Sequence, residues 1–164
     1  RVKRNLQKRP RACARGRFFV LNVCMALDTQ TSFLKLHISC EYDAVRGTAG
    51  QVRSFLAEQK VGESDLWACE LAFVEACNNV VRYTPASLYS EGVLVEIRRR
   101  DREIEFRIND RSTGFDLPAE IELPAPDQER GRGLYVIKSL MDRMEYVRGA
   151  AGNCLILTKR LRLQ

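Results

Sequence analysis

The amino-acid sequence predicts an α/β (α+β) fold, a two-layer sandwich in which a mostly antiparallel sheet carries three helices on one face. Two patterns carry this prediction. Five segments alternate apolar and polar residues, as half-buried strands do, and three others place apolar residues three or four positions apart, as helices do. Their order along the chain is β-α-α-β-β-loop-α-β-β, which favours antiparallel strands with the helices gathered on one side.

The first strand is predicted at residues 32–40, where every second residue from Leu34 to Ile38 is apolar. His37, the only histidine, lies on the polar side of this strand, and we expect it to be solvated. Residues 43–59 then have the apolar spacing of a helix. The buried side of this helix consists of Val45, Val52, Phe55 and Leu56.

The central helix is predicted at residues 66–83. Residues 62–65 supply a helix break, cap residues and early acids, and Thr84 with Pro85 ends the helix. The apolar stripe of the helix consists of Leu66, Cys69, Phe73, Ala76, Cys77 and Val80.

A second face of this helix carries Glu75 and Asn79, which are four residues apart and therefore lie one above the other. An amide oxygen can ligate a hard cation such as Mg²⁺, and a carboxylate can accept a proton from water or a hydroxyl. The pair fits a site for magnesium and phosphate. A solvated helix face explains the same two residues, so the pair alone leaves both interpretations open.

A hairpin is predicted at residues 93–98 and 104–109, with a polar turn at 99–102. Asp110 continues the alternation of the second strand's apolar residues and should therefore point inward. An inward carboxylate is costly unless it has a partner. That partner is either a backbone N–H or arginine of the protein, or a ligand donor such as an exocyclic amine.

Residues 116–130 contain three prolines and are predicted to form a long connector of the kind that often serves as a lid. Gly131, Arg132 and Gly133 follow, and a helix begins at once. Glycines before a helix N-terminus let the backbone approach an anion, and Arg130 and Arg132 would add positive charge. An ordinary helix start also explains this pattern. The helix buries Leu134, Ile137, Leu140, Met141 and Met144, and two strands at 144–147 and 153–161 close the chain.

Composition indicates one domain of ordinary soluble type, with 164 residues and 29% charged residues. The net charge of +6 is concentrated in residues 1–24, which hold eight Lys/Arg and no acid; the other 140 residues carry 19 Lys/Arg against 21 Asp/Glu. Charge therefore gives no case for a nucleic-acid-binding domain. The six cysteines form no C-x-x-C motif and no cluster with histidine, which argues against zinc and favours the reduced core cysteines of a cytoplasmic protein.

Residues 1–24 are interpreted as a basic N-terminal extension and residues 25–164 as the single domain. Met25 opens a polar leader, so our hypothesis is that translation starts there and that 1–24 is an over-assigned start. A disordered basic arm, or a membrane or export signal, are the alternatives. The apolar run at residues 18–27 is too short to cross a bilayer as a helix.

Three stretches resemble motifs of the GHKL ATPase family, and the match is closest to its short anti-sigma-factor serine/threonine kinases. They are ELAFVEACNNVVRY, INDRSTGFD and ERGRGLYVIKSLMDRMEY. They occur in the family's order, and the resemblance covers residues 32–161. It implies a GHKL fold, ATP and Mg²⁺ as ligands, and a cytoplasmic homodimer that phosphorylates an anti-sigma-factor antagonist and sequesters a sigma factor, with no direct contact to nucleic acid or membrane.

The resemblance also implies roles for single residues. Glu75 corresponds to the general base and Asn79 to the Mg²⁺ ligand. Asp110 receives the adenine amino group, and Gly114 is the glycine of the same motif. The glycines that line the phosphates correspond to Gly131 and Gly133, with Arg132 between them. Arg46 falls where the family has an arginine that helps to hold the sigma factor.

The chain departs from the family pattern at three positions. Ser112 stands where the adenine motif usually has glycine, and a positive φ there would cost roughly 1 kcal/mol of strain. Tyr83 replaces a frequent histidine, and Asn153 replaces a threonine whose hydroxyl joins the adenine site; its amide could substitute.

Two other functions remain open. One is a non-catalytic GHKL-fold module that sequesters a regulator, and the other is a kinase acting on a signalling partner outside a sigma-factor circuit. A detached histidine-kinase ATPase domain fits less well, because no dimerisation helix or phospho-acceptor histidine precedes the domain.

Overall fold

The computed structural model describes residues 19–20, 31–125, 131–150 and 152–162. Most of the N-terminal extension lies outside these ranges, as does Met25, so the division of the chain at residue 25 stays a prediction. Arg130 also lies outside the described residues. In the described part, no helix is both long and apolar enough to cross a membrane.

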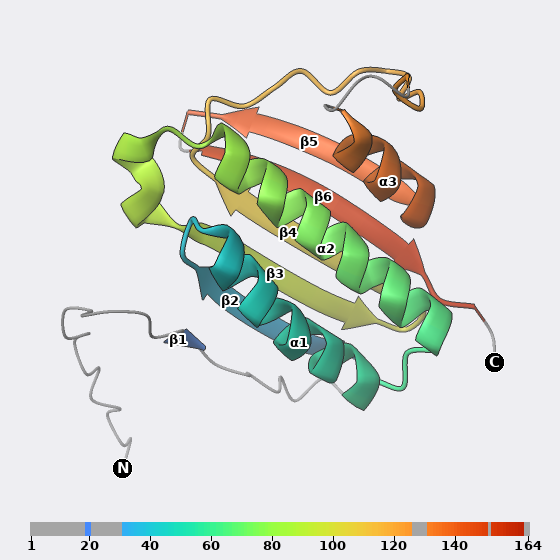
Figure 1. The fold of residues 1–164 in the computed structure, drawn as a ribbon. Helices are drawn as coiled ribbons and strands as arrows, with labels where there is room; N and C mark the ends of the chain where they lie inside the picture. Colours follow the sequence, from blue (N-terminus) through green and yellow to red (C-terminus); the bar gives the residue numbers. More distant parts are fainter. Residues whose placement is uncertain (1–18, 21–30, 126–130, 151, 163–164) are drawn as a thin grey trace, which may run out of the picture.

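The strands form one antiparallel sheet in the order β1-β2-β3-β4-β6-β5 (Figure 1). The short β1 pairs with the outer edge of β2 through two residues. The final hairpin folds back so that β6 lies between β4 and β5, which leaves β5 at the edge. The strands span Phe19–Val20 (β1), Thr31–Ile38 (β2), Val93–Arg100 (β3), Glu103–Asp110 (β4), Arg143–Gly149 (β5) and Gly152–Arg160 (β6).

The three helices lie on the same face of this sheet (Figure 1). They span Tyr42–Glu58 (α1), Glu63–Tyr83 (α2) and Arg132–Leu140 (α3), and a 3₁₀ helix, η1, spans Ala86–Glu91. In Figure 1, α2 crosses the middle of the sheet, with α1 on one side and α3 on the other. The two-layer α+β sandwich predicted from the sequence is therefore confirmed.

The core lies between the helices and the sheet. Alternate strand residues such as Val95, Ile97 and Phe106 are fully buried beneath α2. The predicted apolar stripe of α2 is confirmed, since each of its six residues is buried, and Phe73 and Cys77 have no exposed surface. Burying this stripe fixes the rotation of α2 about its axis, and therefore the direction in which its second face points.

Several predicted boundaries are wrong. The central helix begins at Glu63 rather than Leu66, and the first predicted strand ends at Ile38 rather than Cys40. The polar turn of the first hairpin consists of Asp101 and Arg102 alone, because β3 continues to Arg100 and pairs there with Glu103. The third helix ends at Leu140, whereas its apolar spacing suggested that it continues to Met144. Met144 instead pairs with Leu157 in the closing hairpin. The apolar spacing of these residues suits a helix, but their backbone groups form hydrogen bonds with β6, so the segment becomes a strand.

The cysteines that the structure describes are free thiols. Burial raises the pKa of Cys69 to about 12 and also raises that of Cys77, so both remain protonated and inert. Cys154 was predicted to be a core residue, and this is wrong. It is half-buried on the helix-free face of β6, while its neighbours Asn153 and Leu155 are buried.

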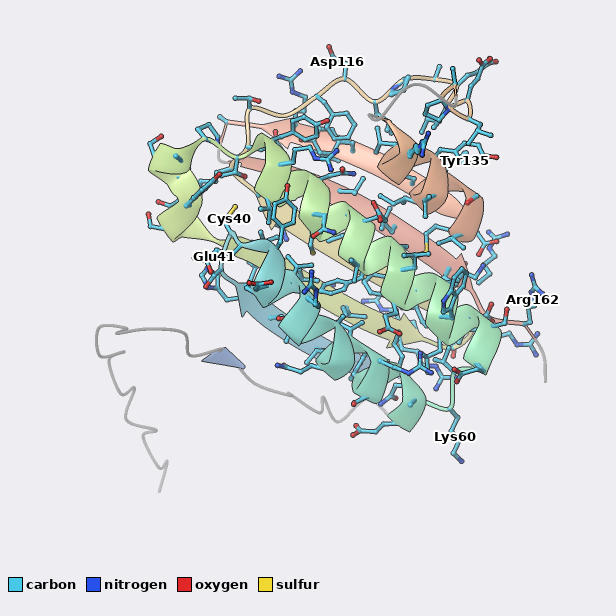
Figure 2. All side chains as sticks on the ribbon, viewed as in Figure 1. Cys40, Glu41, Lys60, Asp116, Tyr135 and Arg162 are labelled. Atoms are coloured by element: carbon cyan, nitrogen blue, oxygen red, sulfur yellow. The ribbon has the colours of Figure 1, made fainter. Side chains whose placement is uncertain are left out.

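A polar cluster joins α2 and α3 to the end of β6. Lys159 donates a hydrogen bond from Nζ to the carbonyl of Leu140 at 2.9 Å, and the same Nζ lies 4.0 Å from a carboxylate oxygen of Asp65 in α2. The backbone N–H of Arg162 donates to the other oxygen of Asp65. Arg162 lies at the end of the sheet opposite Cys40 (Figure 2). The cluster therefore holds the start of α2 and the end of α3 on β6.

Candidate functional site

A cavity of about 140 Å³ opens between α2, the start of α3 and the sheet. Its walls come from the C-terminal half of α2, from the end of β4 and the connector after it, and from β5 and β6. In Figure 2, Asp116 marks the connector and Tyr135 marks α3 on this side of the molecule. An apolar cavity of about 150 Å³ can hold a benzene ring, so this one has room for a planar ring.

Asn79 lines the cavity from α2, and both Asn79 and Glu75 lie beside the start of α3. A Cβ atom built on Gly133 would lie 3.0 Å from Oε2 of Glu75 and 3.3 Å from both amide atoms of Asn79. The carboxylate and the amide thus face bare backbone in the first turn of α3. Both side chains are half-buried, and Asn79 and Gly133 line the cavity.

The start of α3 has the geometry of an anion site. Gly131 precedes the helix with a φ of 92°, a left-handed conformation that glycine adopts without penalty. The N–H groups of the first helical turn have no partners within the helix, and the helix dipole gives that end partial positive charge. Arg132 is the first residue of α3 and is exposed. The backbone can therefore receive phosphate groups next to Glu75 and Asn79.

Asp110 lies at the other end of the cavity, where β4 ends. Its inward orientation is confirmed, since only 6% of its surface is exposed. Its Oδ1 accepts hydrogen bonds from the backbone N–H of Ser112 at 2.7 Å and from Nδ2 of Asn153 at 3.4 Å. Oδ2 makes no hydrogen bond within the described part of the chain. The protein thus holds one oxygen of Asp110 and leaves the other available to a ligand donor.

The loop after Asp110 does not carry the strain considered for Ser112. Among the described residues, Lys60 and Asp101 are the non-glycine residues with positive φ, so Ser112 is unstrained. The left-handed residue of this loop is Gly114, with a φ of 73°. A Cβ on Gly114 would lie 3.2 Å from Oδ1 of Asn153 and 3.3 Å from the hydroxyl of Tyr146. Glycine is therefore required at 114 for both conformation and space.

Asn153 holds two residues of the site, Asp110 and Ser112, by hydrogen bonds. It is 8% exposed, pairs with Asp110 across the sheet, and donates from Nδ2 to the carbonyl of Ser112 at 3.0 Å as well as to Asp110. Its amide therefore ties the start of the loop to β6. Its hydrogen bond to Oδ1 helps to fix the orientation of the Asp110 carboxylate.

The site also contains an aromatic pair that the sequence analysis missed. Phe115 and Tyr146 stack with ring centroids 4.2 Å apart, and both line the cavity. Tyr146 lies in β5 opposite Leu155, on the core side of the sheet. Its alternation with Met144, within the strand predicted at 144–147, is the signal that could have found it.

The structure brings together most of the residues singled out from the sequence. Asn79, Asp110, Gly131 and Gly133 line one cavity, with Glu75 against Gly133. Arg46 is not among them. It lies on α1 with 83% of its side chain exposed, 3.7 Å from the carboxylate of Asp43.

Comparison with known proteins agrees with this architecture. The family model described as "Histidine kinase-like ATPase domain" matches residues 38–159, which is more than half of the chain. The crystal structure of the RsbU and RsbW domains of Rv1364c from Mycobacterium tuberculosis superposes with a TM-score of 0.62 at 24% sequence identity. The match covers 79% of this chain but 32% of that chain, so the present chain spans about a third of its length. The fold and the extent of the family match together assign this chain to the histidine kinase-like ATPase domain family.

Proposed function

We propose that this chain is an ATP-dependent serine/threonine protein kinase of the anti-sigma-factor type. It phosphorylates an anti-sigma-factor antagonist and sequesters a sigma factor. The observation that carries the proposal is the meeting of Glu75, Asn79 and the backbone of Gly133 at one end of a cavity whose other end holds Asp110.

The two ends of the cavity match the two ends of a nucleoside triphosphate. Oδ2 of Asp110 accepts a hydrogen bond from the exocyclic amine of adenine, while Oδ1 stays bound to Ser112. The phosphates lie over the start of α3, where Gly131 and Gly133 let the backbone approach them and Arg132 adds positive charge. Gly114 and Asn153 shape the adenine end.

The residues present fit a magnesium ion shared with a substrate. Mg²⁺ usually takes one or two protein oxygens and fills its other positions with water and substrate phosphates. The described residues contain no cluster of three or more His, Cys, Asp or Glu that could hold a metal alone. The amide oxygen of Asn79 would hold the ion beside the phosphates, where the ion supplies positive charge against the phosphate oxygens.

Glu75 acts as the general base. It accepts the proton of a serine or threonine hydroxyl of the protein substrate as that oxygen bonds to the γ-phosphorus and the bond to ADP breaks. Positioning and charge neutralisation supply most of the acceleration in phosphoryl transfer. Gly133 contributes by leaving the Glu75 carboxylate room beside the phosphate site.

The partner classes are proposed from the motifs and from the structural neighbour. The motif resemblance favours an anti-sigma-factor kinase that works as a homodimer, and the solved structure that superposes on this chain contains an RsbW domain. Arg46 is sufficiently exposed on α1 to contact a sigma factor.

The test is calorimetric titration of ATP into the full 164-residue chain, with and without Mg²⁺. We expect Mg²⁺-dependent binding that Asp110→Asn weakens at least tenfold, because the amide puts an NH₂ group where a second acceptor is needed. Asp116→Asn is the matched control, since Asp116 is an exposed carboxylate of the connector paired with Arg148. Absence of binding at millimolar ATP would refute the kinase proposal and favour the non-catalytic binding module.

A further inference from the structure

Tyr146 lines the cavity, and its hydroxyl is buried without a hydrogen-bond partner. Among the described residues, only this oxygen and Nε of Arg99 are buried side-chain polar atoms with no partner. The side chain of Ser112 and the backbone of Phe115 lie near the phenol, but neither meets hydrogen-bond geometry. A buried polar atom without a partner costs folding free energy, so a phenylalanine would serve the free protein better.

The ring is held so that this hydroxyl has a defined position. Tyr146 stacks on Phe115 with an interplanar angle of 28°, and β5 fixes its backbone against β6. The hydroxyl lies 3.3 Å from the position that a Cβ of Gly114 would occupy. A side chain at residue 114 would therefore crowd this hydroxyl.

The protonation state of Tyr146 makes it a hydrogen-bond donor. Burial, and then the nearby negative charge of Asp110, raise the pKa of Tyr146 above its ordinary value. The phenol consequently carries its proton throughout the neutral range. The carboxylate oxygens of Asp110, by contrast, are hydrogen-bond acceptors.

The adenine end therefore offers an acceptor on Asp110 and a donor on Tyr146, while Nδ2 of Asn153 is already bound to Asp110 and Ser112. Adenine presents the matching pattern, because its exocyclic amine donates and the ring nitrogens on either side of it accept. Guanine presents a carbonyl oxygen where adenine has the amine, and that oxygen would face a carboxylate.

We propose that Tyr146 is a specificity-determining residue that donates its hydroxyl hydrogen bond to a ring nitrogen of adenine beside the exocyclic amine. This inference rests on the proposed function, and it deepens the description of the adenine site. Tyr146 and Asp110 together recognise a neighbouring acceptor and donor on the base. The unpaired hydroxyl of the free protein finds its partner when the nucleotide binds.

The test is calorimetric titration of ADP, 1-deaza-ADP and 7-deaza-ADP into the wild-type chain and Tyr146→Phe. We expect Tyr146→Phe to bind ADP about tenfold more weakly than the wild type. One of the two deaza analogues should bind the wild type about tenfold more weakly than ADP does, yet bind Tyr146→Phe as well as ADP does. Tyr89→Phe is the matched control, because Tyr89 is an exposed tyrosine of η1 outside this cavity.

A second readout separates this role from a structural one. Thermal unfolding of the free Tyr146→Phe chain should occur at or above the wild-type midpoint, because the variant removes an unpaired buried hydroxyl. Wild-type ADP affinity in Tyr146→Phe, or a lowered unfolding midpoint, would overturn the inference while leaving the kinase proposal in place. Failure of the wild type to bind any adenine nucleotide would instead overturn both.

Discussion

Gly133 and Glu75 meet so closely that a Cβ atom on Gly133 would lie 3.0 Å from Oε2 of Glu75. The first turn of α3 therefore packs its bare backbone against the carboxylate of α2. The same point lies 3.3 Å from both amide atoms of Asn79. Glycine at 133 keeps open the volume that the proposed phosphates need.

Gly133→Ala should separate stability from catalysis. Alanine favours a helix over glycine by about 0.5–1 kcal/mol, but its methyl group would displace the Glu75 carboxylate by a few tenths of an ångström. We expect an unfolding free energy within about 1 kcal/mol of the wild type and a loss of phosphoryl transfer of roughly tenfold or more, because small misplacements of reacting groups are costly. Denaturant unfolding and a transfer assay measure the two effects. Ser139→Ala, on an exposed part of the same helix, is the control and should leave transfer unchanged.

Glu75→Ala should keep ATP binding and lose transfer. Removing a general base typically costs about 10²–10⁴ in rate, whereas the adenine and phosphate contacts lie on other residues. The measurement is a single-turnover assay with ATP and the unphosphorylated protein substrate, alongside ATP calorimetry. Glu70→Gln changes an α2 carboxylate that is paired with Arg53 and should transfer normally. Transfer at the wild-type rate in Glu75→Ala would show that another group takes the proton.

Asn79→Ala should abolish the Mg²⁺ dependence of ATP binding. The variant removes the amide oxygen proposed to hold the ion, so added Mg²⁺ should no longer strengthen binding. The adjacent Asn78→Ala removes the same chemical group at a residue outside the cavity and is an exact chemical match as a control. ATP titrations with and without Mg²⁺ compare the two variants. Equal Mg²⁺ responses in both would exclude Asn79 as the ligand.

Lys159→Met should destabilise the fold without removing any residue from the cavity. Lys159 is 12% exposed, and its loss would leave the carboxylate of Asp65 and the carbonyl of Leu140 without their cation. Breaking a buried ion pair costs about 3–5 kcal/mol; the 4.0 Å separation from Asp65 favours the lower end, about 3 kcal/mol. Urea unfolding measures the change. Lys138→Met, at an exposed position of α3, should stay within about 0.5 kcal/mol of the wild type.

Local patterns predicted much of the fold and part of the candidate site. Asp110 could be placed inward because strand alternation has a period of two, and the α2 stripe could be identified because its apolar residues recur at helical spacing. The same reasoning failed between Met141 and Met144. There the apolar spacing suits a helix, but β6 supplies backbone partners and the chain becomes β5.

The sequence by itself determined which segments become helices and strands and which face of each is buried, because those properties depend on residues two to four positions apart. It also contained the motifs that indicated a GHKL fold. Only the tertiary structure decided that Gly133 lies against Glu75, that Asn153 holds Asp110, and that the hydroxyl of Tyr146 is buried without a partner. Each of these contacts joins elements distant in the chain, so it exists only once helix packing and sheet register have fixed the distances between them.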